Sequence, residues 1–317
     1  MPGAAAHVGF ESHSPSWNRL LGALPVAEYE RLLPDLELVS LRPGRRIYDA
    51  GERQRYLYFL TQGIVCRQSV LDDGASAGAA VTGSEGVIGL AAFLGGGSTT
   101  SEAVVLSHAY AYRLRTDLLK EEFELNGPLP QLLLRYTEAL FSQVAQIAAC
   151  NRHHSLEQRL CRLLLSCLDR LPSSLLTMTH ERVADVLGVR REGVTQAVGM
   201  LRMAGLLHSR RGQFVVLDRF RLETHACDCY PVGKREYDHL LADYRYGEVA
   251  CIPRRVARVH TLPQPNAARV RPCATGKGTA RIVSAGCARP YWEPMTASFR
   301  PRACCLVSPP RMGRTAV

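Results

Sequence analysis

The chain has 317 residues, 46% of them hydrophobic, and a formal net charge of +10, which suits two ordinary globular domains. No uninterrupted apolar run approaches the roughly 20 residues that a membrane helix needs, and no basic segment followed by an apolar stretch opens the sequence. We therefore expect a cytoplasmic protein without a membrane partner. The charge is unevenly placed, because residues 245–317 hold 13 Lys and Arg against Glu248 and Glu293, a net charge of +11.

Residues 17–126 are predicted to form an N-terminal domain built mainly of strands. Helical spacing from Trp17 to Leu33 is followed, between Leu36 and Leu114, by short strand-like runs that glycines separate. Many short strands at near-regular spacing indicate a small antiparallel β-roll.

A long helix is predicted over residues 128–153. Leu133, Leu140 and Ile147 repeat at seven-residue spacing. Thr137 and Val144 fall between them, at the second core position of each heptad. Such a stripe favours a two-stranded coiled coil, although a helix packed on its own roll gives the same pattern. We take it as the dimer interface of a homodimer, formed by Leu133, Thr137, Leu140, Val144 and Ile147.

Residues 155–218 contain the most specific pattern in the chain, the stretch from Met178 to Leu207. Thr179 can cap a short helix, and Gly188 can end it in a left-handed turn. A second helix follows with Val194, Val198 and Leu201 on its inward face, and a short basic hairpin comes next. A helix, a tight turn, a second helix and a hairpin predict a winged helix-turn-helix that binds double-stranded DNA.

The outward residues of the second helix match the edges of bases. Arg pairs with guanine, Gln with adenine, and Glu accepts from cytosine. The expected base-contacting residues are Arg191, Glu192, Thr195 and Gln196, and the expected phosphate-contacting residues are Thr179, His180, Arg190, Arg210 and Arg211.

Two segments follow the winged domain. Residues 219–244 read as a partly helical extension with some packing capacity. Residues 246–317 alternate Arg, Pro, Ala, Gly and Cys without apolar periodicity, which predicts a disordered basic tail. That tail is either an arm that adds nonspecific affinity for DNA or an extension of the reading frame without a role.

The cysteines do not follow the spacing of a zinc site or a disulfide framework. Cys150 lies in a helical pattern, Cys227 and Cys229 are one residue apart, and none belongs to a paired C-x-x-C motif. We expect buried thiols, no metal and no cofactor. No Ser-His-Asp, Cys-His or paired-carboxylate arrangement can be assigned either, so we do not expect an enzyme.

The stretch from Trp17 to Leu241 resembles the Crp/Fnr family of transcription regulators. "VRREGVTQAV" is similar to the recognition-helix signature of that family, with Gly193 where Thr or Ser is usual. "PGRRIYDAGERQRYLYFLTQGIV" is similar to its cyclic-nucleotide-binding-like roll. The resemblance implies an α+β fold with three parts: an N-terminal antiparallel β-roll, a long dimerisation helix and a C-terminal winged helix-turn-helix. It also implies a palindromic operator, a small-molecule effector that is not identified, and RNA polymerase as a partner.

The phosphate-binding segment departs from the family pattern. In "EGVIGLAAFLGGGSTTSEAVV", Glu102 stands where the phosphate-gripping Arg is expected, and a carboxylate repels phosphate. We therefore expect that the domain does not bind cyclic AMP. Candidates for an effector pocket are Glu85, Gly86, Gly89 and Glu102. The alternative function is a cyclic-nucleotide-binding regulatory module that docks a protein partner.

Overall fold

The computed structural model describes residues 13–125, 127–242 and 260–261. Every described residue belongs to one compact unit, Met1–Pro265. None of the helices in these ranges is long and apolar enough to cross a membrane.

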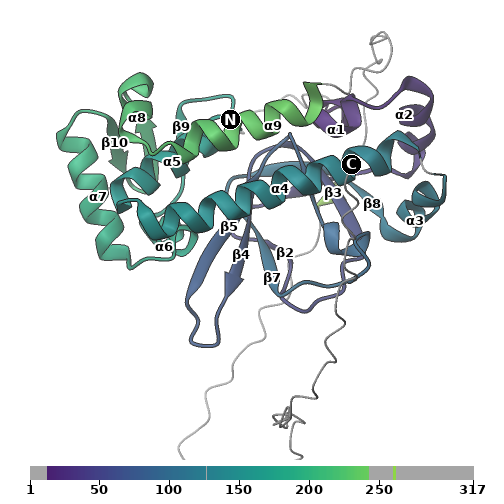
Figure 1. The fold of residues 1–317 in the computed structure, drawn as a ribbon, viewed down its shortest axis with the longest axis horizontal. Coiled ribbons are helices and arrows are strands. Elements are labelled where there is room, and N and C mark those ends of the chain that lie inside the picture. The colour runs from purple at the N-terminus through teal and green to yellow at the C-terminus, as the bar shows by residue number, and fades with distance from the viewer. Residues whose placement is uncertain (1–12, 126, 243–259, 262–317) are drawn as a thin grey trace, which may run out of the picture. The chain divides into compact units, whose positions relative to one another are not determined.

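The N-terminal domain is an antiparallel roll of two sheets, as predicted (Figure 1). One sheet has the strand order β1-β8-β3-β6 and the other β2-β7-β4-β5. Inward residues from both sheets, such as Val39, Leu60, Val65 and Val105, are fully buried and form the interior of the roll. The strands are β1 (Glu37–Leu41), β2 (Arg46–Tyr48), β3 (Tyr56–Gln62), β4 (Val65–Val70), β5 (Ser76–Thr82), β6 (Val87–Ile88), β7 (Ser101–Val105) and β8 (Ala109–Arg115).

Short helices close the roll at its start. Asn18 caps α1, because its Oδ1 accepts from the backbone N–H groups of Leu20 and Leu21, and its Nδ2 donates to the carbonyls of Leu60 and Gly86. One buried amide thus joins the entry helix to strand β3 and to the turn before β6. The helical elements are η1 (Pro15–Trp17), α1 (Arg19–Gly22), α2 (Val26–Leu32), η2 (Leu33–Asp35), η3 (Leu90–Ala92) and α3 (Thr116–Glu124).

A two-residue strand, β12 (His260–Thr261), pairs in parallel with β1. It lies inside the range 246–317 that the sequence predicts to be disordered, so the prediction does not hold for these two residues. The pairing uses backbone groups of the edge strand β1, which no side-chain pattern in the sequence announces. The other residues of the predicted tail lie outside the described part of the chain.

The long helix α4 (Pro128–His153) packs on the chain's own roll, which differs from the expectation for Leu133 and Leu140 of the predicted dimer interface. Leu133 is 0% exposed and Leu140 is 5% exposed, and both belong to the core that α4 forms with the roll and the N-terminal helices. Thr137, Val144 and Ile147 are half-buried. Leu133 and Leu140 of the seven-residue row therefore face the roll, whereas Ile147 lies outside this core.

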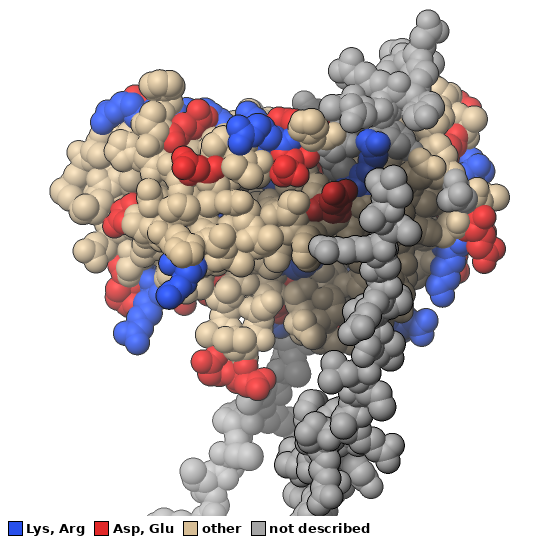
Figure 2. Space-filling model, in the orientation of Figure 1, with Lys and Arg blue, Asp and Glu red and all other residues tan. Residues whose placement is uncertain are grey.

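A second row on α4 remains open in the single chain. Leu134 is 53% exposed and Phe141 is 76% exposed, at a spacing of seven residues, and Ala145 and Ala148 continue this exposed surface. Figure 2 shows few charged side chains along the middle of the surface, where α4 runs. This row is one position away from the predicted one, which corresponds to about 100° around a helix.

The winged domain begins where α4 ends. Ser155 and Gln158 form a capping box at the start of α5 (Leu156–Leu168). The hairpin strands pair with β9 in the order β10-β11-β9. The remaining elements are β9 (Leu175–Thr177), α6 (His180–Leu187), α7 (Arg191–Met203), β10 (Leu207–Arg210) and β11 (Gln213–Val216).

The extension after the wing folds back along α4. It contains α8 (Arg219–His225) and α9 (Cys229–Ala242), and α9 lies beside α4 in Figure 1. Tyr237, near the end of α9, donates from its hydroxyl to Gln143 Oε1 at 3.1 Å, while Cys229, at the start of α9, contacts Gln146. The two helices therefore run antiparallel.

Candidate DNA-binding interface

Local signals in the sequence place α7 against α6. Thr179 Oγ1 accepts a hydrogen bond from the backbone N–H of Arg182 at 3.2 Å and caps α6. Gly188 ends α6 at φ +64°, a left-handed conformation that residues with a Cβ rarely adopt. The chain then turns into α7, and Val194, Val198 and Leu201 pack in the core beneath it.

The four predicted base-contacting residues lie on the open face of α7. Arg191, Glu192, Thr195 and Gln196 are all exposed, while Ala197 between the two faces is buried. They occupy the first turn and a half of the helix, the part that enters a major groove in helix-turn-helix proteins. Arg191 also lies 3.9 Å from Glu181, a pair so exposed that water screens most of its attraction.

His180 connects α7 to the wing. Its Nδ1 lies 3.1 Å from Thr195 Oγ1, and its Nε2 lies 3.3 Å from Ser209 Oγ. Thr195 donates its own hydroxyl proton to the carbonyl of Arg191 at 3.1 Å, so Nδ1 donates to Thr195, and in the neutral imidazole Nε2 then accepts from Ser209. Burial first, and then the charge of Arg191, lowers the pKa of His180, which favours this neutral form.

The phosphate contact expected of His180 stays a prediction, and the structure gives the residue a further role. Both ring nitrogens are bonded within the domain, so His180 positions Thr195 and the wing. The sequence does not predict the contact between Ser209 and His180, because the two residues are 29 positions apart and no local pattern links them.

The wing presents two arginines at a tight turn. Arg211 at φ +50° and Gly212 at φ +74° form a two-residue connection between β10 and β11 in which both residues are left-handed, as in a type I′ hairpin. Arg210 and Arg211 are exposed, and so is Arg190 at the start of α7. The Thr179 hydroxyl proton is not needed for the cap and remains available to a phosphate.

Comparison with known proteins agrees with both halves of this architecture. Residues 158–224 match the Crp-like helix-turn-helix domain, and residues 38–126 match the cyclic nucleotide-binding domain. The chain is a Crp/Fnr-type DNA-binding transcription regulator. The sequence prediction of this family is thereby confirmed, as is the predicted class of fold.

Relatives of this Crp/Fnr-type regulator match over nearly their whole length. The transcriptional regulator LdrP of Thermus thermophilus is 27% identical over 190 residues, which cover 57% of this chain and 92% of the relative. A Crp-family regulator structure from the same organism has 25% identity and a TM-score of 0.52, covering 59% of this chain and 95% of the other. FixK2 from Bradyrhizobium japonicum, at 21% identity, shares the fold with a TM-score of 0.54 and coverages of 61% and 98%.

Two of the predicted effector residues of this Crp/Fnr-type regulator, Glu85 and Glu102, contact different partners. Glu85 accepts from Arg170 Nε at 2.7 Å, and both side chains are buried. Glu102 lies elsewhere, paired with Arg46 at 3.0 Å and hydrogen-bonded by Gln68 at 2.6 Å. These two carboxylates therefore serve different contacts, and the effector pocket stays a prediction.

The two glycines of the predicted pocket are also closed by neighbouring groups. A Cβ on Gly86 would lie 2.3 Å from the ring of Tyr136, so α4 packs directly against this turn. Gly89 has φ +108°, and a Cβ there would lie 2.4 Å from the carbonyl oxygen of Tyr56. Both glycines are explained by close packing and backbone conformation.

A polar cavity of about 170 Å³ lies next to Glu85. The turn between β5 and β6, together with α1, α4, α5 and α9, forms its walls. Its charged lining residues are Arg19, Glu85, Arg162, Asp169, Arg170, Lys234 and Asp238.

Proposed function

We propose that this regulator binds a palindromic operator as a homodimer, with α7 of each subunit in the major groove of one half-site. The observation that carries the proposal is the exposed row Arg191, Glu192, Thr195 and Gln196 at the N-terminal end of α7. Arg190, Arg210, Arg211 and the Thr179 hydroxyl surround that row and supply phosphate contacts, which fix the orientation of the helix without reading sequence.

The dimer in this proposal uses the open row of α4. Leu134 and Phe141 repeat at heptad spacing on a largely uncharged face, as the seam of a two-stranded coiled coil requires. Two copies of α7 then read two half-sites about one helical turn apart, and a monomer loses the joint contacts.

The alternative of a nucleotide-binding module that docks a protein is not favoured. A surface that docks a protein does not need side chains that complement bases on α7, nor a basic wing beside them. We infer instead that the roll senses a small molecule other than cyclic AMP, that DNA-bound dimers contact RNA polymerase, and that the protein works in the cytoplasm.

The direct test is selection of binding sites from random DNA with the full chain, followed by sequencing. The expected result is an inverted repeat with half-site centres about 10 base pairs apart, or a multiple of that spacing. Enrichment of no sequence, or of a single unrepeated site, would overturn the proposal.

A further inference from the structure

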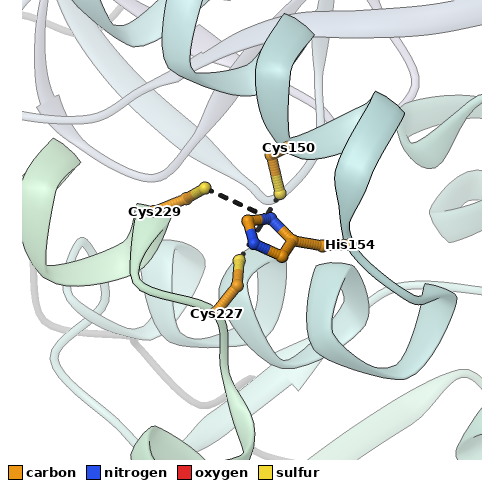
Figure 3. Close-up of side chains that lie close together, drawn as sticks. All are labelled: Cys150, His154, Cys227 and Cys229. Carbon is orange, nitrogen blue, oxygen red and sulfur yellow. Dashed lines mark hydrogen bonds between the residues drawn. The ribbon is translucent and has the colours of Figure 1, made fainter.

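Three cysteines and a histidine meet where α4 ends and α9 begins (Figure 3). The sulfur atoms of Cys150, Cys227 and Cys229 and a ring nitrogen of His154 all lie within 4.8 Å of one another. All three cysteines are free thiols. The cluster takes no part in the DNA-binding interface described above.

The backbone aims the four side chains at one point. Cys150 and His154 are four residues apart at the end of α4, so they lie on the same side of the helix, and the N–H of His154 donates to the carbonyl of Cys150 at 3.1 Å. Cys227 precedes α9 and Cys229 opens it, and the N–H of Tyr230 bonds back to the carbonyl of Cys227 at 3.0 Å. This turn brings both thiols to the side that faces α4.

The distances fit a single tetrahedral ion. Zinc bonds of about 2.3 Å to sulfur and 2.0–2.1 Å to nitrogen give separations between ligand atoms of about 3.6–3.8 Å. In the structure, Cys150 Sγ lies 3.5 Å from Cys227 Sγ, and Cys229 Sγ lies 3.5 Å from His154 Nδ1. An iron–sulfur cluster places several irons and sulfides between its ligands, so its cysteine sulfurs must lie farther apart than they do here.

The surroundings also suit an ion bound by thiolates. Gln146 Nε2 lies 3.0 Å from Cys229 Sγ and can donate to a thiolate, the kind of outer contact that orients metal ligands. Arg159 of α5 interacts electrostatically with Cys150, and its buried Nε has no hydrogen-bond partner among the described residues. Three thiolates and one Zn²⁺ carry a net charge of −1, which this guanidinium would offset.

We propose that Cys150, His154, Cys227 and Cys229 bind one Zn²⁺ ion, which fastens the segment after the wing to the end of α4. Each bound cysteine gives its thiol proton to solvent, and the ion undergoes no redox change. Four protein ligands complete the tetrahedral shell, so the site is structural and leaves no open position for a substrate. The ion joins the end of the long helix α4 to the start of α9. One of its ligands, His154, directly precedes Ser155, the residue that caps α5.

The sequence predicts no metal because the ligands are distributed in two pairs. Cys150 and Cys227 are 77 residues apart, and neither pair has the C-x-x-C spacing that announces a zinc site. Only the antiparallel packing of α9 on α4 brings the pairs together.

The test measures zinc in the full chain, purified with a thiol reductant. Mass spectrometry of the elements should give about one zinc per chain, and Co²⁺ substituted for it should show the visible spectrum of a tetrahedral, sulfur-bound ion. Cys150→Ser and Cys227→Ser should lose the ion. Cys161→Ser, which removes a fully buried thiol of α5 outside the cluster, is the matched control and should retain it.

Two milder variants keep the test decisive if the cysteine variants fail to fold. His154→Ala removes a half-buried ligand and should weaken zinc binding by more than about 100-fold, whereas Gln146→Ala removes an outer contact and should weaken it by about 10–100-fold. Chelation of the ion should also speed amide hydrogen exchange at the start of α9 in the wild-type chain.

Several results would overturn the proposal. One is a reduced, folded chain that takes up neither Zn²⁺ nor Co²⁺, and another is full zinc content in the His154→Ala and Cys227→Ser variants. If the purified chain contains iron and sulfide, the four residues bind an iron–sulfur cluster and not a single zinc ion. A Cys150–Cys227 disulfide as the only stable state of the pair would make the site a redox crosslink.

Discussion

His180 donates from Nδ1 to Thr195 Oγ1 across 3.1 Å, and this bond ties the first residue of α6 to the open face of α7. The opposite ring nitrogen accepts from Ser209 of the wing. A single neutral imidazole therefore sets two parts of the DNA-binding interface relative to each other.

The His180 contacts predict a pH-dependent stability. The folded-state pKa of His180 is lowered from its ordinary 6.5, so its contribution is present above that pH and is lost as the pH falls through the folded-state pKa. His180→Ala should lower the free energy of unfolding by about 1 kcal/mol near neutral pH and remove this dependence. Denaturant unfolding at several pH values measures both, with His208→Ala, an exposed imidazole on β10, as the control. Equal pH profiles for wild type and His180→Ala would contradict the assignment.

Arg191→Ala should weaken operator binding by roughly 1–3 kcal/mol and relax the preference at one position of each half-site. The reason is that an Arg on the first turn of α7 can bond both acceptors of a guanine. Arg202→Ala removes the same charge from the last turn of that helix and should leave the preference intact. Binding measured over a panel of single-base operator variants separates the two. Uniform weakening by Arg191→Ala on every sequence would make Arg191 a phosphate contact.

The dimer interface is tested at Phe141, which is 76% exposed in the single chain. Phe141→Glu should yield folded monomers with much weaker operator binding, because it places a charge in the proposed seam without disturbing the core. Leu140→Ala, one residue away but buried, should instead lower stability by about 2–5 kcal/mol and preserve the dimer. Sedimentation and denaturant unfolding of both variants provide the measurement. An intact dimer of the Phe141→Glu variant would rule out this seam.

Cyclic AMP should not bind the roll at physiological concentrations. The sequence resemblance leads us to expect Glu102 where the family has an Arg; the Glu102 carboxylate pairs with Arg46, and Tyr136 of α4 fills the space beside Gly86. Calorimetric titration of the full chain should give no binding heat, and cyclic GMP serves as a comparison ligand. Micromolar affinity for cyclic AMP would show that a phosphate site exists elsewhere in the roll.

Removal of residues after Asp243 should lower affinity for every duplex and leave the preferred sequence unchanged. Residues 245–317 carry a net charge of +11, and basic side chains bind DNA by releasing counterions from phosphates. The truncated chain should therefore show a flatter dependence of log affinity on log salt, measured on operator and random DNA. Equal slopes would mean that these residues do not contact DNA, and a changed consensus would mean that they read bases.

The sequence by itself determined the elements whose signals are local. Thr179 and Gly188 delimit α6 through contacts within a few residues, and the outward row of α7 follows from helical spacing once those ends are known. The antiparallel roll was predictable for a similar reason, since short apolar runs and glycine turns repeat along the chain.

The tertiary structure decided the features that depend on which surfaces meet. Two apolar rows one position apart run along α4, and the spacing cannot tell which row the roll covers, because burial of either satisfies the same hydrophobic pattern. His180 and Ser209, like Cys150 and Cys227, are brought within bonding distance only by the packing of separate segments. A side chain's partners are set by three-dimensional proximity, and residues distant along the chain carry no local mark of it.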